Sequence, residues 1–326
     1  MLSRVADSLF WLGRYAERTE TNTHVLLTAL DHILEQSTKD VSYREYWAHV
    51  VAICGFGDRD DFDVNSMQEE QLIRYVLCDP ANYNAIVPLI ESVRFNLKNV
   101  RDIIPNELYE VWNELYLEMQ ELDSGMENSL LLTMDFLQKV YRTSLTASGI
   151  IDSIMIRDES FQFLKIGKWM ERSEKTALIV KEFLKHDNEM LSHEFAAGIA
   201  LSFTNSLVEY TRKYRSRDTL DMLNFIIKDT NCSRSVAYGL RKIRKTVEDI
   251  EAGRQEPYTK ELFRQIKKIE QLLTRDAHDM TYEERLEWVE EIGVLCTLLG
   301  PVFSATYYLT PPLAVDEKAM QIIGSE

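Results

Sequence analysis

Apolar and polar residues recur along this chain with the spacing of helices almost everywhere. In residues 3–36, for example, Leu9, Leu12 and Leu30 fall on one side of a helix, opposite a run of charged residues. Alternation with a period of two, which indicates strands, is hard to find. The pattern predicts helices near residues 3–36, 42–53, 66–78, 84–102, 105–122, 128–155, 158–185, 190–212, 216–228, 233–250, 258–275 and 281–308.

Composition and helix-start signals agree with this pattern. The 326 residues include only 12 Gly and 7 Pro, which favours long helices over β-structure with many turns. Capping boxes, a hydroxyl residue followed three positions later by Glu, begin at Ser42, Ser66 and Thr281. We therefore expect an all-α protein, a bundle of long helices with no sheet.

One segment near the start of the chain returns almost half a chain later. Residues 12–20, LGRYAERTE, correspond to residues 166–174, IGKWMERSE, at an offset of 154. A repeat that keeps charges as well as apolar positions predicts a duplicated unit with a paired charged site. We expect two duplicated halves related by a pseudo-twofold axis, residues 1–155 and 156–309, packed as one globule and followed by a tail, 310–326.

A second correspondence, at an offset of 150 residues, supports this division. Residues 77–86 and 227–236 each contain a helix end, an Asp, a short polar turn and the start of a new helix. Arg94 and Arg244 follow at the same offset. Each half is therefore expected to repeat the same order of long and short helices.

The repeated segments carry a charged stripe on one helix face. Bulky apolar residues flank this stripe in both copies, so neighbouring helices are expected to cover it. A buried charge without a partner costs several kcal/mol, which predicts the pairs Glu17 with Arg172 and Glu171 with Arg18. The candidate binding or ionic-latch residues are Arg14, Glu17, Arg18, Lys168, Glu171 and Arg172.

Two roles of the stripe stay open. It could be an internal latch that fixes how the halves dock, or a polar pocket whose basic residues grip an anionic group. His24 lies just beside it and fits a structural hydrogen bond or a base. The secondary candidates are Arg157, Asp158, Arg234, Arg94 and His24.

Several functional classes are disfavoured. With 37 Lys and Arg against 53 Asp and Glu, the net charge of −16 argues against nucleic acid and anionic membranes. The four cysteines lack C-x-x-C spacing, no Glu-x-x-His of a di-iron bundle occurs, and nucleotide-loop and hydrolase motifs are absent. No signal peptide is recognised, and no uncharged apolar run reaches about 18 residues. We expect a cytoplasmic protein with no metal site, no cofactor and no membrane span.

Residues 1–18, MLSRVADSLFWLGRYAER, and residues 157–172, RDESFQFLKIGKWMER, resemble the alpha-E family. This is a bacterial all-helical family named for its Glu-Arg motifs. The resemblance extends to about residue 308. Ala16 and Met170 precede the Glu-Arg pairs where the family more usually has Val or Leu.

The resemblance implies a setting more than a reaction. Such proteins accompany a circularly permuted ATP-grasp ligase and a transglutaminase-like peptidase, which implies peptide or amide-bond chemistry and a peptide or amino-acid substrate. Three functions stay open: an accessory or substrate-holding component, an enzyme that uses Glu17 or Glu171 as acid–base, and a structural scaffold.

Overall fold

The computed structural model describes residues 2–35, 41–55, 64–121, 129–185, 193–214, 218–254 and 256–307. Within these residues every long element is a helix and no strand occurs, so the expected all-α class is confirmed. The first half contains α1 (Ser3–Glu35), α2 (Val41–Cys54), η1 (Val64–Ser66), α3 (Glu69–Leu77), α4 (Ile86–Asn99), α5 (Asn106–Glu121) and α6 (Leu130–Ile154). The second contains α7 (Glu159–Lys185), α8 (His193–Phe203), α9 (Leu207–Lys213), α10 (Thr219–Lys228), α11 (Val236–Ile250), η3 (Pro257–Thr259), α12 (Lys260–Leu272), η4 (Ala277–Asp279) and α13 (Tyr282–Thr306).

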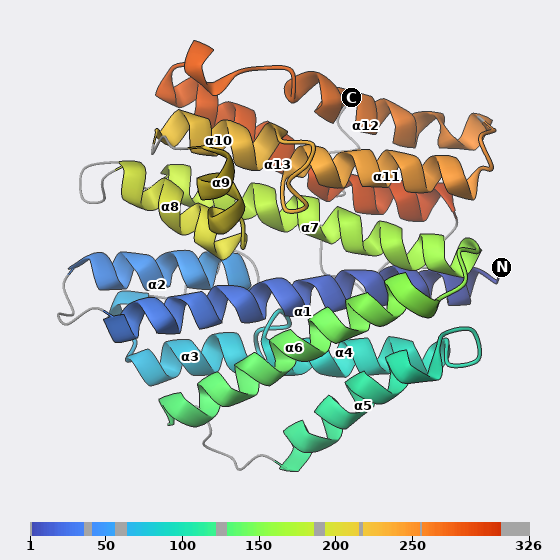
Figure 1. Cartoon of the computed structure of the whole chain (residues 1–326), viewed down its shortest axis with the longest axis horizontal. Coiled ribbons are helices and arrows are strands. Elements are labelled where there is room, and N and C mark those ends of the chain that lie inside the picture. Colours follow the sequence, from blue (N-terminus) through green and yellow to red (C-terminus); the bar gives the residue numbers. More distant parts are fainter. Residues whose placement is uncertain are drawn as a thin grey trace.

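The two longest helices, α1 and α7, lie side by side in the middle of the bundle (Figure 1). Helices α4 and α6 pack on α1, and α11 and α13 pack on α7. The outer helices follow the same rule, since α5 packs on α4 and α6 while α12 packs on α11 and α13. Helix for helix, the second half repeats the packing of the first, with α9 as an addition. This is the arrangement expected of two related halves, and their origin by duplication stays a prediction.

Two glycines set the distance between α1 and α7. A Cβ atom on Gly13 would lie 2.1 Å from the carbonyl oxygen of Leu164, and one on Gly167 would lie 2.1 Å from that of Phe10. Each of these contacts is the counterpart of the other at the 154-residue offset. The two helix backbones therefore touch at this crossing, which brings the charged stripes of the two segments face to face.

The predicted single helix at 190–212 is wrong. The structure has α8 and α9 instead, separated at residues 204–206. Asn205 has φ 52°, in the left-handed region that ends helices and that Asn tolerates better than most residues. The sequence gives little warning of this break because neither Gly nor Pro marks it.

The helix-start signals have mixed outcomes. The Thr281 box is confirmed, since the Thr281 amide donates to Glu284 Oε2 at 2.7 Å and the Glu284 amide donates to Thr281 Oγ at 3.3 Å. The Ser66 box is wrong, because α3 begins only after Gln68, whose amide donates to Gln71 Oε1 at 2.8 Å. The Ser42 side chain and the predicted tail lie outside the described residues.

Helix α13 is the one helix in the described part of the chain that is long and apolar enough to cross a membrane. Its sequence contains Pro301, which lies inside the helix without ending it. In its most apolar window 44% of the residues are buried inside the fold, and core helices commonly pass the same test of length and composition. This helix is therefore weak evidence for a membrane span.

The helix crossing can be tested with two glycine substitutions. Gly13→Ala is expected to lower the free energy of unfolding by about 1–3 kcal/mol, because its Cβ meets backbone that cannot move without separating α1 from α7. Gly149→Ala in α6 is the control, since nothing lies within 4 Å of its Cβ and a gain of about 0.5–1 kcal/mol is expected. Urea unfolding of both variants measures the difference, and equal stability of the two would contradict the backbone contact.

Candidate functional site: a charged seam between two helices

Successive turns of α1 and α7, together with Arg234 from the turn before α11, bring acidic and basic side chains together along the α1–α7 interface. Most of these side chains are buried, with Glu17 and Glu171 only 2% and 1% exposed. We call this set the charged seam. Its members are Arg14, Glu17, Arg18, Glu20, Lys168, Glu171, Arg172, Glu174, Lys175 and Arg234.

Two arginine–glutamate pairs form the centre of the seam. Arg172 donates from Nε and Nη2 to the two oxygens of Glu17, at 2.5 and 2.8 Å. Arg18 donates in the same way to the two oxygens of Glu171, at 2.6 and 3.0 Å. Both pairs are those expected from the sequence, so the pairing is confirmed. The planar guanidinium makes two parallel bonds to one carboxylate, which fixes the relative position of the helices as well as their charge balance.

Two further carboxylates, Glu174 and Glu20, extend the seam by one helical turn on each side. Arg14 donates from Nε to Glu171 at 2.7 Å and from Nη2 to Glu174 at 2.6 Å. On the other side Arg234 donates to Glu20, and it reaches Glu17 Oε1 at 3.4 Å. Glu20 and Glu174 were not among the site residues predicted from the sequence. Their unchanged recurrence at the 154-residue offset was the signal that could have found them.

The polar turns that precede α4 and α11 are held against the seam in corresponding ways. Asn22 donates to the carbonyl of Asn84 at 2.8 Å, and Thr176 donates to the carbonyl of Arg234 at 2.9 Å. Asn84 also accepts from Arg18 Nη1 at 2.8 Å. The side-chain amide of Asn84, in the turn before α4, therefore occupies the position that the guanidinium of Arg234 occupies in the turn before α11.

The seam contains one more basic group than acidic groups on each side. The Arg14 side comprises Arg14, Arg18 and Lys175 with Glu171 and Glu174. The Lys168 side comprises Lys168, Arg172 and Arg234 with Glu17 and Glu20. Lys175 Nζ donates to the Ile53 carbonyl at 2.6 Å, and Lys168 Nζ donates to Ser148 Oγ at 2.5 Å. Each surplus cation is thus a lysine whose Nζ donates to a neutral oxygen, and Lys175 is buried whereas Lys168 is partly buried.

The surroundings in the seam lower the pKa values of two carboxylates and also lower the pKa of a lysine, Lys168. Burial alone would raise the pKa of Glu171, but Arg18 and Arg14 lower it to about 2. Burial would likewise raise the pKa of Glu20, which the neighbouring guanidinium groups lower to about 2. In contrast, burial and the charge of Arg172 lower the pKa of Lys168 to about 8. At neutral pH Glu20 and Glu171 are charged, and a fraction of Lys168 has lost its proton.

Three secondary candidates lie outside the seam. Arg157 donates to the carbonyls of Ile151 and Asp152 at the end of α6, and Asp158 accepts from the Phe161 amide at the start of α7. These contacts stabilise the last turn of α6 and the first turn of α7. Arg94 donates to Asn113 Oδ1 at 3.0 Å and covers the Tyr116 ring, which joins α4 to α5.

His24 lies beside the seam and connects α1 to α8. Its Nε2 is 2.9 Å from the carbonyl oxygen of Ser202, and its ring stacks on Tyr141 at 5.5 Å between centroids. Burial is the main cause of a lowered pKa for this imidazole. These contacts fit a neutral, structural histidine.

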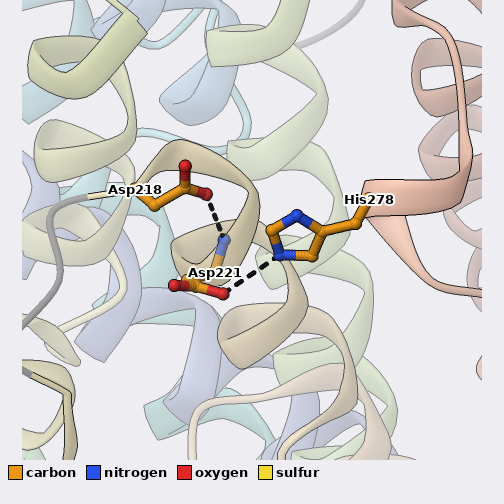
Figure 2. A group of neighbouring side chains, drawn as sticks. All are labelled: Asp218, Asp221 and His278. Carbon is orange, nitrogen blue, oxygen red and sulfur yellow. Dashed lines mark hydrogen bonds and ion pairs between the residues drawn. The ribbon is translucent and has the colours of Figure 1, made fainter.

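Asp218, Asp221 and His278 form a separate group, which was not predicted from the sequence (Figure 2). Their donor atoms lie within 4.8 Å of one another, close enough to consider a metal ion. Asp218 Oδ1 accepts from the amides of Leu220 and Asp221, and His278 Nε2 is 3.0 Å from Asp221 Oδ1. A helix cap and a hydrogen bond between His278 and Asp221 therefore account for the grouping.

Comparisons with known proteins place the chain in a family. Residues 1–308 match Alpha-E, described as a predicted alpha-helical domain with a conserved ER motif. Uncharacterized proteins of Mycobacterium bovis and Mycobacterium tuberculosis are 22% identical over 264 residues, covering 76% of this chain and 30% of each relative. The chain therefore matches less than a third of the length of these relatives. No solved structure gives a significant match.

The central pairs can be tested by removing one charge. Glu17→Gln is expected to lower the free energy of unfolding by about 3–5 kcal/mol, because it leaves the fork of Arg172 buried without its full partner. Glu290→Gln is the control, since Glu290 pairs with Lys181 at 2.6 Å but its side chain is 51% exposed, so less than about 1 kcal/mol is expected. Urea unfolding distinguishes them, and similar losses would contradict a structural latch.

The lowered carboxylate pKa values predict sensitivity to acid. The folded chain holds Glu20 and Glu171 ionised down to pH values of about 2, whereas the unfolded chain protonates them near 4.5. Unfolding therefore takes up protons as the pH falls below about 5, and the stability from these groups is lost as the pH approaches 2. The urea midpoint is expected to be unaffected by these groups between pH 7 and 6 and to fall steeply below pH 5. A midpoint that is constant down to pH 3 would contradict this.

Proposed function

The chain belongs to the Alpha-E family, and we propose that it is an accessory component of a peptide or amide-bond-forming system. In this proposal it docks on a circularly permuted ATP-grasp ligase or holds its peptide substrate, and a transglutaminase-like peptidase acts in the same system. The ligase supplies the nucleotide chemistry, which suits a chain without a phosphate-binding loop.

The observation that carries the accessory role is the engagement of the seam carboxylates. Both oxygens of Glu17 and both oxygens of Glu171 accept hydrogen bonds from an arginine fork. A general base near neutral pH needs a pKa close to the working pH and room for a substrate proton. Glu171, with a pKa of about 2, meets neither condition. This favours a latch at the seam over acid–base catalysis by these two glutamates.

The latch gives the proposed component its rigidity. Since each central pair joins α1 to α7, and each of these helices carries the packing of its own half, the pairs hold the two halves in one relative position. A fixed arrangement lowers the entropy cost of binding a partner. A structural scaffold, the third function left open by the sequence, is thus included in the accessory role.

Two further observations support the proposal. In the mycobacterial relatives the matching region covers 30% of the chain, so most of each relative lies outside it. A region of this kind suits a domain that acts together with other domains. None of the four cysteines, all of which lie in the described part of the chain, forms a disulfide, which suits the reducing cytoplasm in which ATP-dependent ligation takes place. The proposed system is therefore a cytoplasmic one.

Co-purification tests the proposal. The tagged chain is expected to retain the ATP-grasp ligase of the same organism, and the amount retained is expected to change at least about threefold when ATP and peptide are added, because docking and substrate holding are coupled. Gly149→Ala, which leaves the seam untouched, is the positive control. Absence of a complex by pull-down and by sedimentation, with and without ATP, would exclude the accessory role.

A further inference from the structure

The two sides of the charged seam differ at one pair of corresponding positions, Arg14 and Lys168. Arg14 is bound by two carboxylates, Glu171 and Glu174, and α13 closes over it. Its Nη1 lies 2.7 Å from the place where Gly300 would carry a Cβ. The Arg14 position is therefore filled, and its guanidinium is bound by two carboxylates.

Lys168 is held far less firmly. Among the described residues it meets one carboxylate within 4 Å, Glu17, at 3.9 Å. Its closest hydrogen bond joins Nζ to Ser148 Oγ of α6, at 2.5 Å. A lysine thus stands where the other half has an arginine, and it faces a hydroxyl where the arginine faces carboxylates.

A cavity of about 30 Å³ lies beside Lys168, between α1, α5, α6 and α7. Apolar side chains form most of its wall, among them Leu12, Leu108 and Trp112. Its polar lining comprises Glu17, Glu20, Ser144, Ser148 and Lys168. The Lys168 side chain is 13% exposed, and the space exceeds what one water needs, so the head group of a small molecule fits next to the amine.

The surroundings of Lys168 favour a neutral amine. Burial lowers its pKa first, and the charge of Arg172 lowers it further, to about 8. The other charged groups that act on it are Glu17, Glu20 and Lys165. Roughly a tenth of the amine is unprotonated at pH 7 with such a pKa. Loss of this proton also removes the surplus positive charge on the Lys168 side. An arginine cannot respond in this way because it keeps its proton.

We propose that Lys168 is a nucleophilic amine that binds the carbonyl group of a small aldehyde or ketone covalently in this cavity. A buried lysine next to a second cation is a known route to an amine that reacts near neutral pH. The neutral Nζ attacks the carbonyl carbon, and one of its two protons passes to the carbonyl oxygen to give a carbinolamine. The second Nζ proton leaves with this hydroxyl as water, which leaves an imine on Lys168. Ser148 acts as a positioning residue, since its hydroxyl holds Nζ toward the cavity.

Lys175 shows why a lowered pKa alone does not make such a site. Burial lowers the pKa of Lys175 too, but its Nζ is bound to the Ile53 carbonyl at 2.6 Å, deep against the end of α2. Lys168 has both a lowered pKa and a cavity next to its Nζ atom. The proposal concerns the isolated chain and does not depend on association with a ligase.

Reductive alkylation tests the proposal on the intact, unliganded chain. The protein is treated with formaldehyde and cyanoborohydride, and the modified lysines are mapped by peptide mass spectrometry over pH 6–9. Lys168 is expected to react about tenfold faster than Lys165 at pH 7, with a rate that levels off above about pH 8, where the amine is mostly neutral. Lys165 is a matched control, because it lies on the same helix, its side chain is 11% exposed, and it is paired with Asp152 at 2.8 Å.

Two variants complete the test. Lys168→Arg, which installs the residue type of the other half, is expected to fold and to lose only the fast-reacting adduct. Ser148→Ala is expected to slow the reaction at Lys168 several-fold and to leave Lys165 unchanged. Circular dichroism confirms that each variant is folded. A Lys168 that reacts no faster than Lys165 at any pH, or a rate that still rises tenfold per pH unit at pH 9, would overturn the proposal. Neither result would bear on ligase binding.

Discussion

The fold depends on the paired charges between α1 and α7. Two arginine forks bind two glutamates in the interior, where an unpaired ion would cost several kcal/mol. Such pairs are weak evidence of net stability, because desolvation offsets much of their attraction. What they supply is specificity, since slipping one helix by a turn would separate both pairs and leave the buried Glu17, Glu171 and Arg172 without partners. The glycine crossing makes this possible by letting the two backbones touch.

Corresponding positions of the two halves do not all make the same contacts in the seam. Contacts at the glycines, the central pairs and the anchored turns recur from one half to the other. At the edge of the seam the correspondence ends, because Arg14 is bound by two carboxylates and Lys168 by one hydroxyl. Arg14 is therefore enclosed between carboxylates, whereas Lys168 lies beside a cavity. The proposed amine chemistry belongs to the Lys168 side of the seam.

Much of the fold and of the central site could be predicted from sequence because their signals are periodic and local. Helical spacing gave the fold class, and recurrence of the Glu-Arg segment gave the partners of Glu17 and Glu171. The break at Asn205 could not be predicted, because this residue adopts a left-handed conformation and no Gly or Pro nearby signals the end of a helix. Ser148 was missed for another reason. It lies 20 residues from Lys168 on a different helix, and nothing in the spacing indicates that the two side chains meet.

The sequence by itself determined that two charged stripes exist, that they are too well flanked by apolar residues to face water, and that their signs allow reciprocal pairing. These are properties of helix periodicity and of the cost of burying charge. Only the tertiary structure decided that Glu174 and Glu20 join the seam. It also decided that Arg94, Arg157 and Asp158 lie elsewhere and that Lys168 faces a cavity. Such outcomes depend on the angle and distance at which helices cross, and these follow from the packing of side chains that are remote in the chain.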